Sequence, residues 1–189
     1  MEIAQAQADV RRTYSGGWGG PAVSALIWLA AGVTADLFGT SAGAAVLFLA
    51  GAALIFPVNL ALNRLVSGEV DLPAGHPMRG LAMQTAATMA VMLLALWMVS
   101  SVVPGAFFPL AMVAVGAHYL PFSHLYGEPA FLVAGAVQCV AGLLVLVSET
   151  SDVFGAYVMA GLLALTSVTL VLRHRRRVRG PRGERLART

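Results

Sequence analysis

Residues 116–128 (GAHYLPFSHLYGE) hold the densest group of side chains that can do chemistry. The segment contains two of the four histidines and two of the four tyrosines in the chain. Histidine titrates near neutral pH, so His118 is a candidate proton carrier or ligand contact. Pro121 cannot donate a backbone hydrogen bond, and the predicted helix should bend or end there. In membrane proteins such breaks expose polar groups to a cavity, which is one interpretation of this segment. The alternative interpretation is a belt of aromatic residues at the level of the lipid headgroups.

Amide side chains form a second group within apolar sequence. Asn59 and Asn63 are four residues apart and share one helical face, just after Pro57. Gln84 lies at a similar predicted depth in the next apolar run, so the two faces can meet. These amides either line a cavity or bind neighbouring helices to one another. The predicted ligand-binding residues are Asn59, Asn63, Gln84, His118 and Tyr119, and the predicted kinks are Pro57, Pro109 and Pro121.

The remaining patterns assign no catalytic residue, metal site or cofactor. His118 and His124 are six residues apart, which is not the spacing of a zinc pair on a helix. No Gly-x-Ser-x-Gly sequence marks a hydrolase nucleophile, and no glycine-rich loop follows a predicted strand. The only cysteine, Cys139, lies within an apolar run.

The elements that position these residues are predicted to be membrane helices. Hydrophobic residues make up 58% of the 189 residues and charged residues only 11%, far from the averages for soluble domains. Apolar runs long enough to cross a bilayer occur six times. They cover residues 21–38, 41–62, 81–102, 105–122, 129–147 and 152–172. We therefore predict an all-α, polytopic bundle of six transmembrane helices.

The positive charges predict the orientation of this bundle. All twelve basic residues are arginines, and they precede the first run, flank the connection between the second and third, or follow the sixth. With six spans all of these positions lie on one side, which the positive-inside rule makes the cytoplasm. The prediction is an N-in, C-in protein with a cytoplasmic segment at residues 1–20, a membrane domain at 21–172 and a basic cytoplasmic tail at 173–189.

The partners expected from this pattern are the lipid bilayer and, at the basic tail, anionic lipid headgroups. We expect no nucleic acid contact, because no aromatic or folded reader module accompanies the arginines. Small residues repeat along the fifth and sixth runs and fit either packing within the bundle or a homo-oligomer. The arginine, alanine and glycine bias suggests a bacterial source, which places the protein in the inner (plasma) membrane.

The phrase VGAHYLPF at residues 115–122, followed by LYG at 125–127, resembles a family of small six-span bacterial membrane proteins described only as a domain of unknown function. Residues 6–12 (AQADVRR) and 55–57 (IFP) are similar too, so the resemblance covers nearly the whole chain. It implies six helices and no established activity. It favours His118 and Tyr119 over His124 as shared functional groups.

Three functions are compatible with these observations. We favour a non-enzymatic membrane protein that binds or translocates a small molecule or ion through an inward-opening cavity. A membrane-embedded enzyme acting on a lipid or isoprenoid, with His118 as general base assisted by Glu128 or Tyr119, is the second. A structural or accessory membrane subunit is the third.

Overall fold

The computed structural model describes residues 2–186 apart from 67, 69–70, 104 and 149, with side chains described as far as Val178. This part of the chain contains seven α-helices, one short 3-10 helix and no strand. The helices are α1 (Ile3–Thr13), α2 (Gly19–Phe38), α3 (Thr40–Val66), α4 (Pro77–Ser100), α5 (Phe107–Tyr126), α6 (Pro129–Val147) and α7 (Asp152–Leu186), and the 3-10 helix η1 (Ser15–Gly17) joins α1 to α2. The predicted all-helical class is confirmed.

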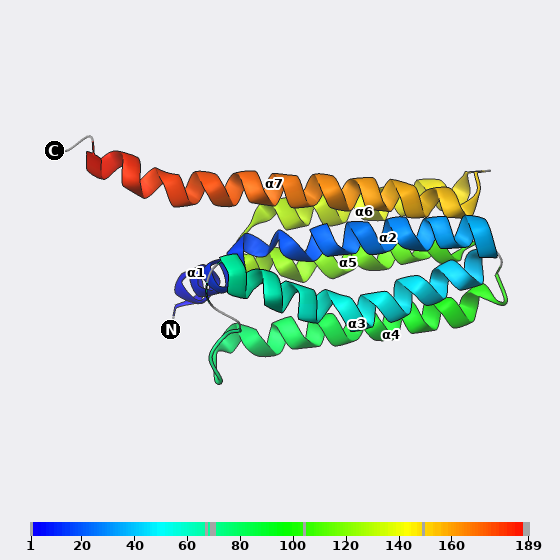
Figure 1. Cartoon of the computed structure of the whole chain (residues 1–189), viewed down its shortest axis with the longest axis horizontal. Coiled ribbons are helices and arrows are strands. Elements are labelled where there is room, and N and C mark those ends of the chain that lie inside the picture. Colours follow the sequence, from blue (N-terminus) through cyan, green and yellow to red (C-terminus); the bar gives the residue numbers. More distant parts are fainter. Residues whose placement is uncertain (1, 67, 69–70, 104, 149, 187–189) are drawn as a thin grey trace.

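Long helices run side by side along the molecule, while α1 lies across one end (Figure 1). Five helices are long and apolar enough to cross a membrane: α2, α3, α4, α6 and α7 as far as Val178. A multi-pass membrane protein is therefore supported. The fourth predicted run, residues 105–122, corresponds to α5, which is 20 residues long but is not among these five.

Burial explains why α5 is less apolar than its neighbours. It packs most extensively on α6 and also contacts α3, α4, α7 and α1. Eleven of its residues are buried, among them Tyr119 and Tyr126. Polar side chains are unfavourable in a membrane helix where they contact lipid. A helix enclosed by other helices can therefore carry tyrosine and histidine.

Small residues bring α5 and α6 close together. A Cβ atom added to Gly116 would lie 2.7 Å from both the Cys139 Sγ and the Gly135 carbonyl oxygen. One added to Gly142 would lie 2.7 Å from the Pro109 carbonyl oxygen. Only glycine permits this approach of two backbones, as in other membrane helix pairs.

The three predicted kink sites behave differently. Pro109 lies in the first turn of α5, where its missing N–H breaks no helical hydrogen bond and gives no cause for a kink. Pro57 and Pro121 lie inside α3 and α5, and both helices continue past them. α5 ends instead at Gly127, whose left-handed conformation (φ 57°) lets the Glu128 N–H reach the Ser123 carbonyl.

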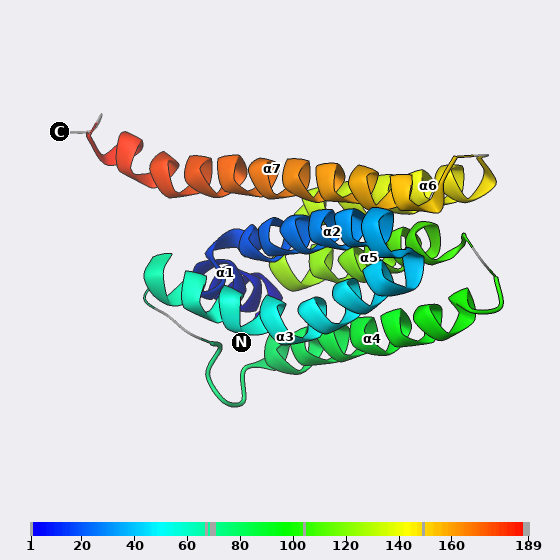
Figure 2. The same cartoon turned by 45° about the vertical axis from the view of Figure 1, so that its right-hand side comes forward.

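The described parts of both terminal segments are helical. Residues 3–13 form helix α1, which buries Ala6, Val10 and Thr13 against the bundle. α7 does not stop at Leu172 but continues as a helix to Leu186, beyond the rest of the bundle (Figures 1 and 2). The described part of the basic tail, as far as Leu186, continues the last helix.

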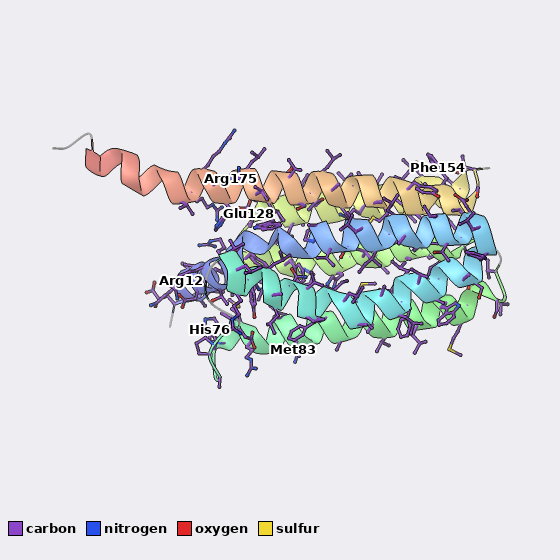
Figure 3. All side chains as sticks on the ribbon, viewed as in Figure 1. Arg12, His76, Met83, Glu128, Phe154 and Arg175 are labelled. Atoms are coloured by element: carbon purple, nitrogen blue, oxygen red, sulfur yellow. The ribbon has the colours of Figure 1, made fainter. Side chains whose placement is uncertain are left out.

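The described arginines gather at one end of the bundle. Figure 3 shows Arg12, His76 and Arg175 at this end and Phe154 at the opposite end. Arg173 and Arg177 reach the buried Glu128 there, at 2.8 and 2.6 Å. We call this the basic end.

Candidate functional site

A cavity of about 410 Å³ lies among α2, α3, α4 and α5. Its walls are mostly apolar, with Trp28, Phe48, Met89 and Leu93 among them. Its size is within the range of small-molecule pockets, which combine apolar walls with a few polar groups. The cavity lies where helix packing is sparse, because α3 and α4 contact each other far less than α2 contacts α3.

Polar side chains mark the part of the cavity nearest the basic end. The Tyr14 hydroxyl donates to Asp71 Oδ1 at 2.6 Å, and Arg79 Nη2 donates to Asp71 Oδ2 at 3.1 Å. The Leu72 N–H also donates to Asp71 Oδ1, at 2.8 Å. All three of Tyr14, Asp71 and Arg79 line the cavity. Together they join the segment before α2 to the loop before α4.

Burial and hydrogen bonding act in opposite directions on the pKa of Asp71. Burial raises the pKa of this carboxyl, but the bonds from Tyr14, Leu72 and Arg79 outweigh it and hold the pKa below its usual value. Burial, together with the bond to the Asp71 carboxylate, raises the pKa of the Tyr14 phenol. At neutral pH Tyr14 is therefore a neutral phenol, and Asp71 is a carboxylate that pairs with Arg79 at 3.1 Å.

The two asparagines of α3 line the same cavity. Asn63 is buried, and Asn59 is half-buried with its Nδ2 donating to the Ile55 carbonyl at 2.7 Å. The Asn59 Oδ1 lies so close to Gly19 that a Cβ atom there would be 2.6 Å away. Asn59 therefore also contributes to the packing of α3 on α2, so both roles expected of the amides are visible in its contacts.

His118 and Tyr119 of α5 also line the cavity. The His118 ring lies 4.7 Å from the Phe122 ring, and Tyr119 is stacked on Phe131 at 5.8 Å. These residues form an aromatic cluster between the C-terminal half of α5 and the start of α6. The arrangement offers His118 an apolar ring environment at the cavity wall.

Gln84 does not belong to this group. Its side chain is exposed and it is not among the lining residues. On α4 the lining face includes Ala82, Ala86 and Met89, which follow the three- and four-residue spacing of a helix. At about 100° per residue, Gln84 lies on the opposite side of the helix from these residues, so its side chain points away from the cavity.

Glu128 is engaged away from His118. It is buried, accepts from the Ala130 N–H at 3.3 Å and pairs with Arg173 and Arg177 of α7. Nearby, the Arg11 guanidinium donates to the Tyr126 carbonyl and Gln7 donates to the His124 carbonyl. These contacts fix α1, α5 and α7 to one another at the basic end.

Sequence reasoning missed the hydrogen-bonded group of lining residues formed by Tyr14, Asp71 and Arg79. The signal for Asp71 and Arg79 was present, because opposite charges flank the turn-rich residues 72–78 before a helix. No local pattern links Tyr14 to Asp71, which is 57 positions further along the chain. Among the residues described, no three histidine, cysteine, aspartate or glutamate side chains lie together in a group suited to a metal ion.

A comparison with models of known protein families finds a match for this chain. Residues 3–173 match the model of a family of unknown function, DUF7010. The chain belongs to this family. The match includes α1, the aromatic cluster of α5 and every helix that lines the cavity. A comparison with curated proteins finds no match, and neither does a comparison with solved structures.

Proposed function

We propose that the protein is an integral membrane protein with six spans that binds a small molecule in the cavity among α2, α3, α4 and α5. The observation that carries this proposal is the combination of apolar walls with polar groups gathered at one end. An ion would need more polar partners along its path than these walls provide. Binding is the function proposed, and passage of the molecule across the membrane is a further step that transport assays can measure.

The orientation proposed is N-in and C-in, with α5 crossing the membrane in addition to the five apolar helices. α5 is 20 residues long, which at about 1.5 Å per residue is about 30 Å, the thickness of a hydrocarbon core. The arginine-bearing segments lie at one end of the bundle, and the positive-inside rule assigns that end to the cytoplasm. The cavity would then open inward, in the inner membrane of a bacterium.

Two further contacts are proposed with the membrane and with a second copy. Arg175 and Arg176 are exposed on α7 and available to anionic headgroups. The exposed apolar faces of α3 and α4 would contact lipid or, in a homo-oligomer, another protomer.

Filling the cavity tests the proposed function. Ala86 lines it and Ala87 does not, although the two are neighbours in α4. Ala86→Phe should displace the bound molecule, whereas Ala87→Phe places the same ring about 100° around the helix. Small molecules that co-purify with each variant would be identified by mass spectrometry. Loss of the same compound from both variants, or from neither, would contradict the proposal.

The geometry gives less support to a lipid-modifying enzyme. Glu128 is held by two arginines, and Tyr119 is buried against Phe131. Glu128 is therefore already paired and is not available to assist His118 as general base. Unchanged lipid turnover in His118→Ala would remove this alternative, whereas its loss with ligand retention would revive it.

A further inference from the structure

We propose that the ligand is a lipid with a single hydrocarbon chain and a small uncharged, hydroxylated head. This proposal rests on the proposed function and names the class of molecule that the cavity takes. Its chain would lie along α3 and α4, with the head between Tyr14 and Arg79. The argument comes from the length of the cavity, its width and the balance of charge at its polar end.

The cavity is long. Its lining on α4 extends from Arg79 to Leu93, a rise of about 21 Å along the helix, and on α3 from Leu47 to Asn63, about 24 Å. These distances correspond to most of the thickness of a hydrocarbon core. A compact molecule such as a sugar or an amino acid would leave most of this length empty.

The cavity is also narrow. A volume of about 410 Å³ spread over about 21 Å gives a mean cross-section of about 20 Å² for the space that the centres of bound atoms can occupy. One hydrocarbon chain therefore fits along the cavity. A second chain packed beside it, with its carbon atoms about 3.5–4.0 Å away, would need nearly the whole of this width.

The walls change character along this length. Asn59, Asn63, Asp71 and Arg79 line the part near the basic end, and Trp28, Leu47 and Leu93 line the other. An apolar tail gains free energy from leaving water for the second part, whereas a polar head needs hydrogen-bonding partners in the first. An amphiphilic ligand therefore fits with its head near the basic end and its tail toward Trp28, Leu47 and Leu93, and not the other way round.

The charges at the polar end favour a head that carries none. Asp71 and Arg79 pair with each other at 3.1 Å, so their charges compensate. A carboxylate head would lie beside Asp71, and an ammonium head beside Arg79. A hydroxyl meets neither repulsion: it can accept from the remaining N–H groups of Arg79 and donate to the Tyr14 oxygen, whose own hydrogen is committed to Asp71.

Trp28 offers a reporter at the apolar end. It is 2% exposed and lines the cavity, so a quencher in solution or in the surrounding lipid has little access to it. The other two tryptophans are Trp18 and Trp97. Replacing both with phenylalanine leaves Trp28 as the only source of indole fluorescence.

The experiment titrates this single-tryptophan protein with a sixteen-carbon alcohol brominated near its methyl end. We expect saturable quenching of Trp28 that the unbrominated alcohol reverses. The same alcohol brominated beside the hydroxyl should compete equally but quench much less. The matched fatty acid, ionised at pH 8, should bind at least about tenfold more weakly.

Ala86→Phe should abolish the quenching, and Ala87→Phe should leave it unchanged. Ala90→Phe, also within the lining, is the second filling variant if Ala86→Phe does not yield folded protein. Equal quenching by both bromine positions would overturn the chain direction, and equal affinity for the acid would overturn the uncharged head.

The outcomes also separate this inference from the proposed function. If no brominated chain quenches Trp28, but Ala86→Phe still loses a different co-purifying molecule, the single-chain lipid is wrong and the binding cavity stands. If Ala86→Phe and Ala87→Phe are indistinguishable in both quenching and bound molecules, both proposals fail.

Discussion

The α5–α6 pair and the α3–α4 pair are built from similar apolar residues but pack in opposite ways. α5 and α6 approach until Gly116 touches the Gly135 backbone, and eleven residues of α5 are buried. α3 and α4 touch sparsely and bury few residues, among them Leu47 and Leu93 at the cavity. The first pair is a tightly packed scaffold. The second leaves space that a ligand can fill.

The largest effect expected is in the tight pair. Gly116→Leu would place a side chain where even a Cβ atom lies 2.7 Å from backbone and sulfur atoms of α6. The helices would have to separate, so we expect a loss of more than about 3 kcal/mol in the free energy of unfolding and little monodisperse protein. Melting temperature and size-exclusion profiles in detergent measure this. A variant that melts like the wild type would contradict the difference between the two pairs.

The next effect concerns the polar contacts that hold the scaffold to α7. Glu128→Gln keeps an acceptor for the Ala130 N–H but leaves Arg173 and Arg177 without their carboxylate. Because the arginines are half-exposed, we expect a cost of about 1–3 kcal/mol. Thermal melting with Glu2→Gln, an exposed control, would show whether the cost is specific to the buried carboxylate.

A smaller effect is expected from the hydrogen bond between Tyr14 and Asp71 at the polar end of the cavity. Tyr14→Phe keeps the ring but removes the hydroxyl that donates to Asp71. We expect a loss of about 0.5–1.5 kcal/mol, together with weaker binding of the brominated alcohol. A drop in stability with unchanged alcohol affinity would mean that Tyr14 supports the fold without contacting the head.

The same contacts predict a dependence on pH. The folded pKa of Asp71 lies below its ordinary value of 3.8, so its carboxylate stabilises the folded state above pH 3.8 and this contribution is lost as the pH falls through the folded pKa. The advantage of the wild type over Asp71→Asn should stay constant from pH 6 to about pH 5 and shrink as the pH falls below 3.8 toward pH 3. Since Asp71 is partly exposed, the difference should be below about 1 kcal/mol. Melting temperatures that keep a constant difference over this range would contradict the assignment.

The smallest effect belongs to the open pair. A Cβ atom on Gly51 of α3 would lie 3.9 Å from Ile55 Cδ1, an ordinary contact. Gly51→Ala should therefore change stability by less than about 1 kcal/mol, with any gain coming from helix propensity. A loss comparable to that of Gly116→Leu would erase the contrast between the two pairs.

Much of the fold was predictable from the chain. The fifth predicted run, residues 129–147, has the same bounds as α6, because Pro129 begins that helix and its interior is uniformly apolar. The cavity residues were predicted in part: Asn59, Asn63, His118 and Tyr119 converge, whereas Gln84 points away. Helix α1 was missed although Ala6, Val10 and Thr13 show helical spacing, since the segment is polar and short.

The sequence by itself determined the helices, the membrane as their solvent and the arginine-rich end, because these depend on local composition and on the cost of placing charge in hydrocarbon. Only the tertiary structure decided which polar groups meet. Tyr14 comes from a segment far in the sequence from Asp71 and Arg79, and α5 is enclosed by other helices, with eleven of its residues buried. Such meetings depend on how closely each pair of backbones can approach. The small residues repeated along the fifth run indicate a close approach, but only the structure shows that α5 is the helix that packs there.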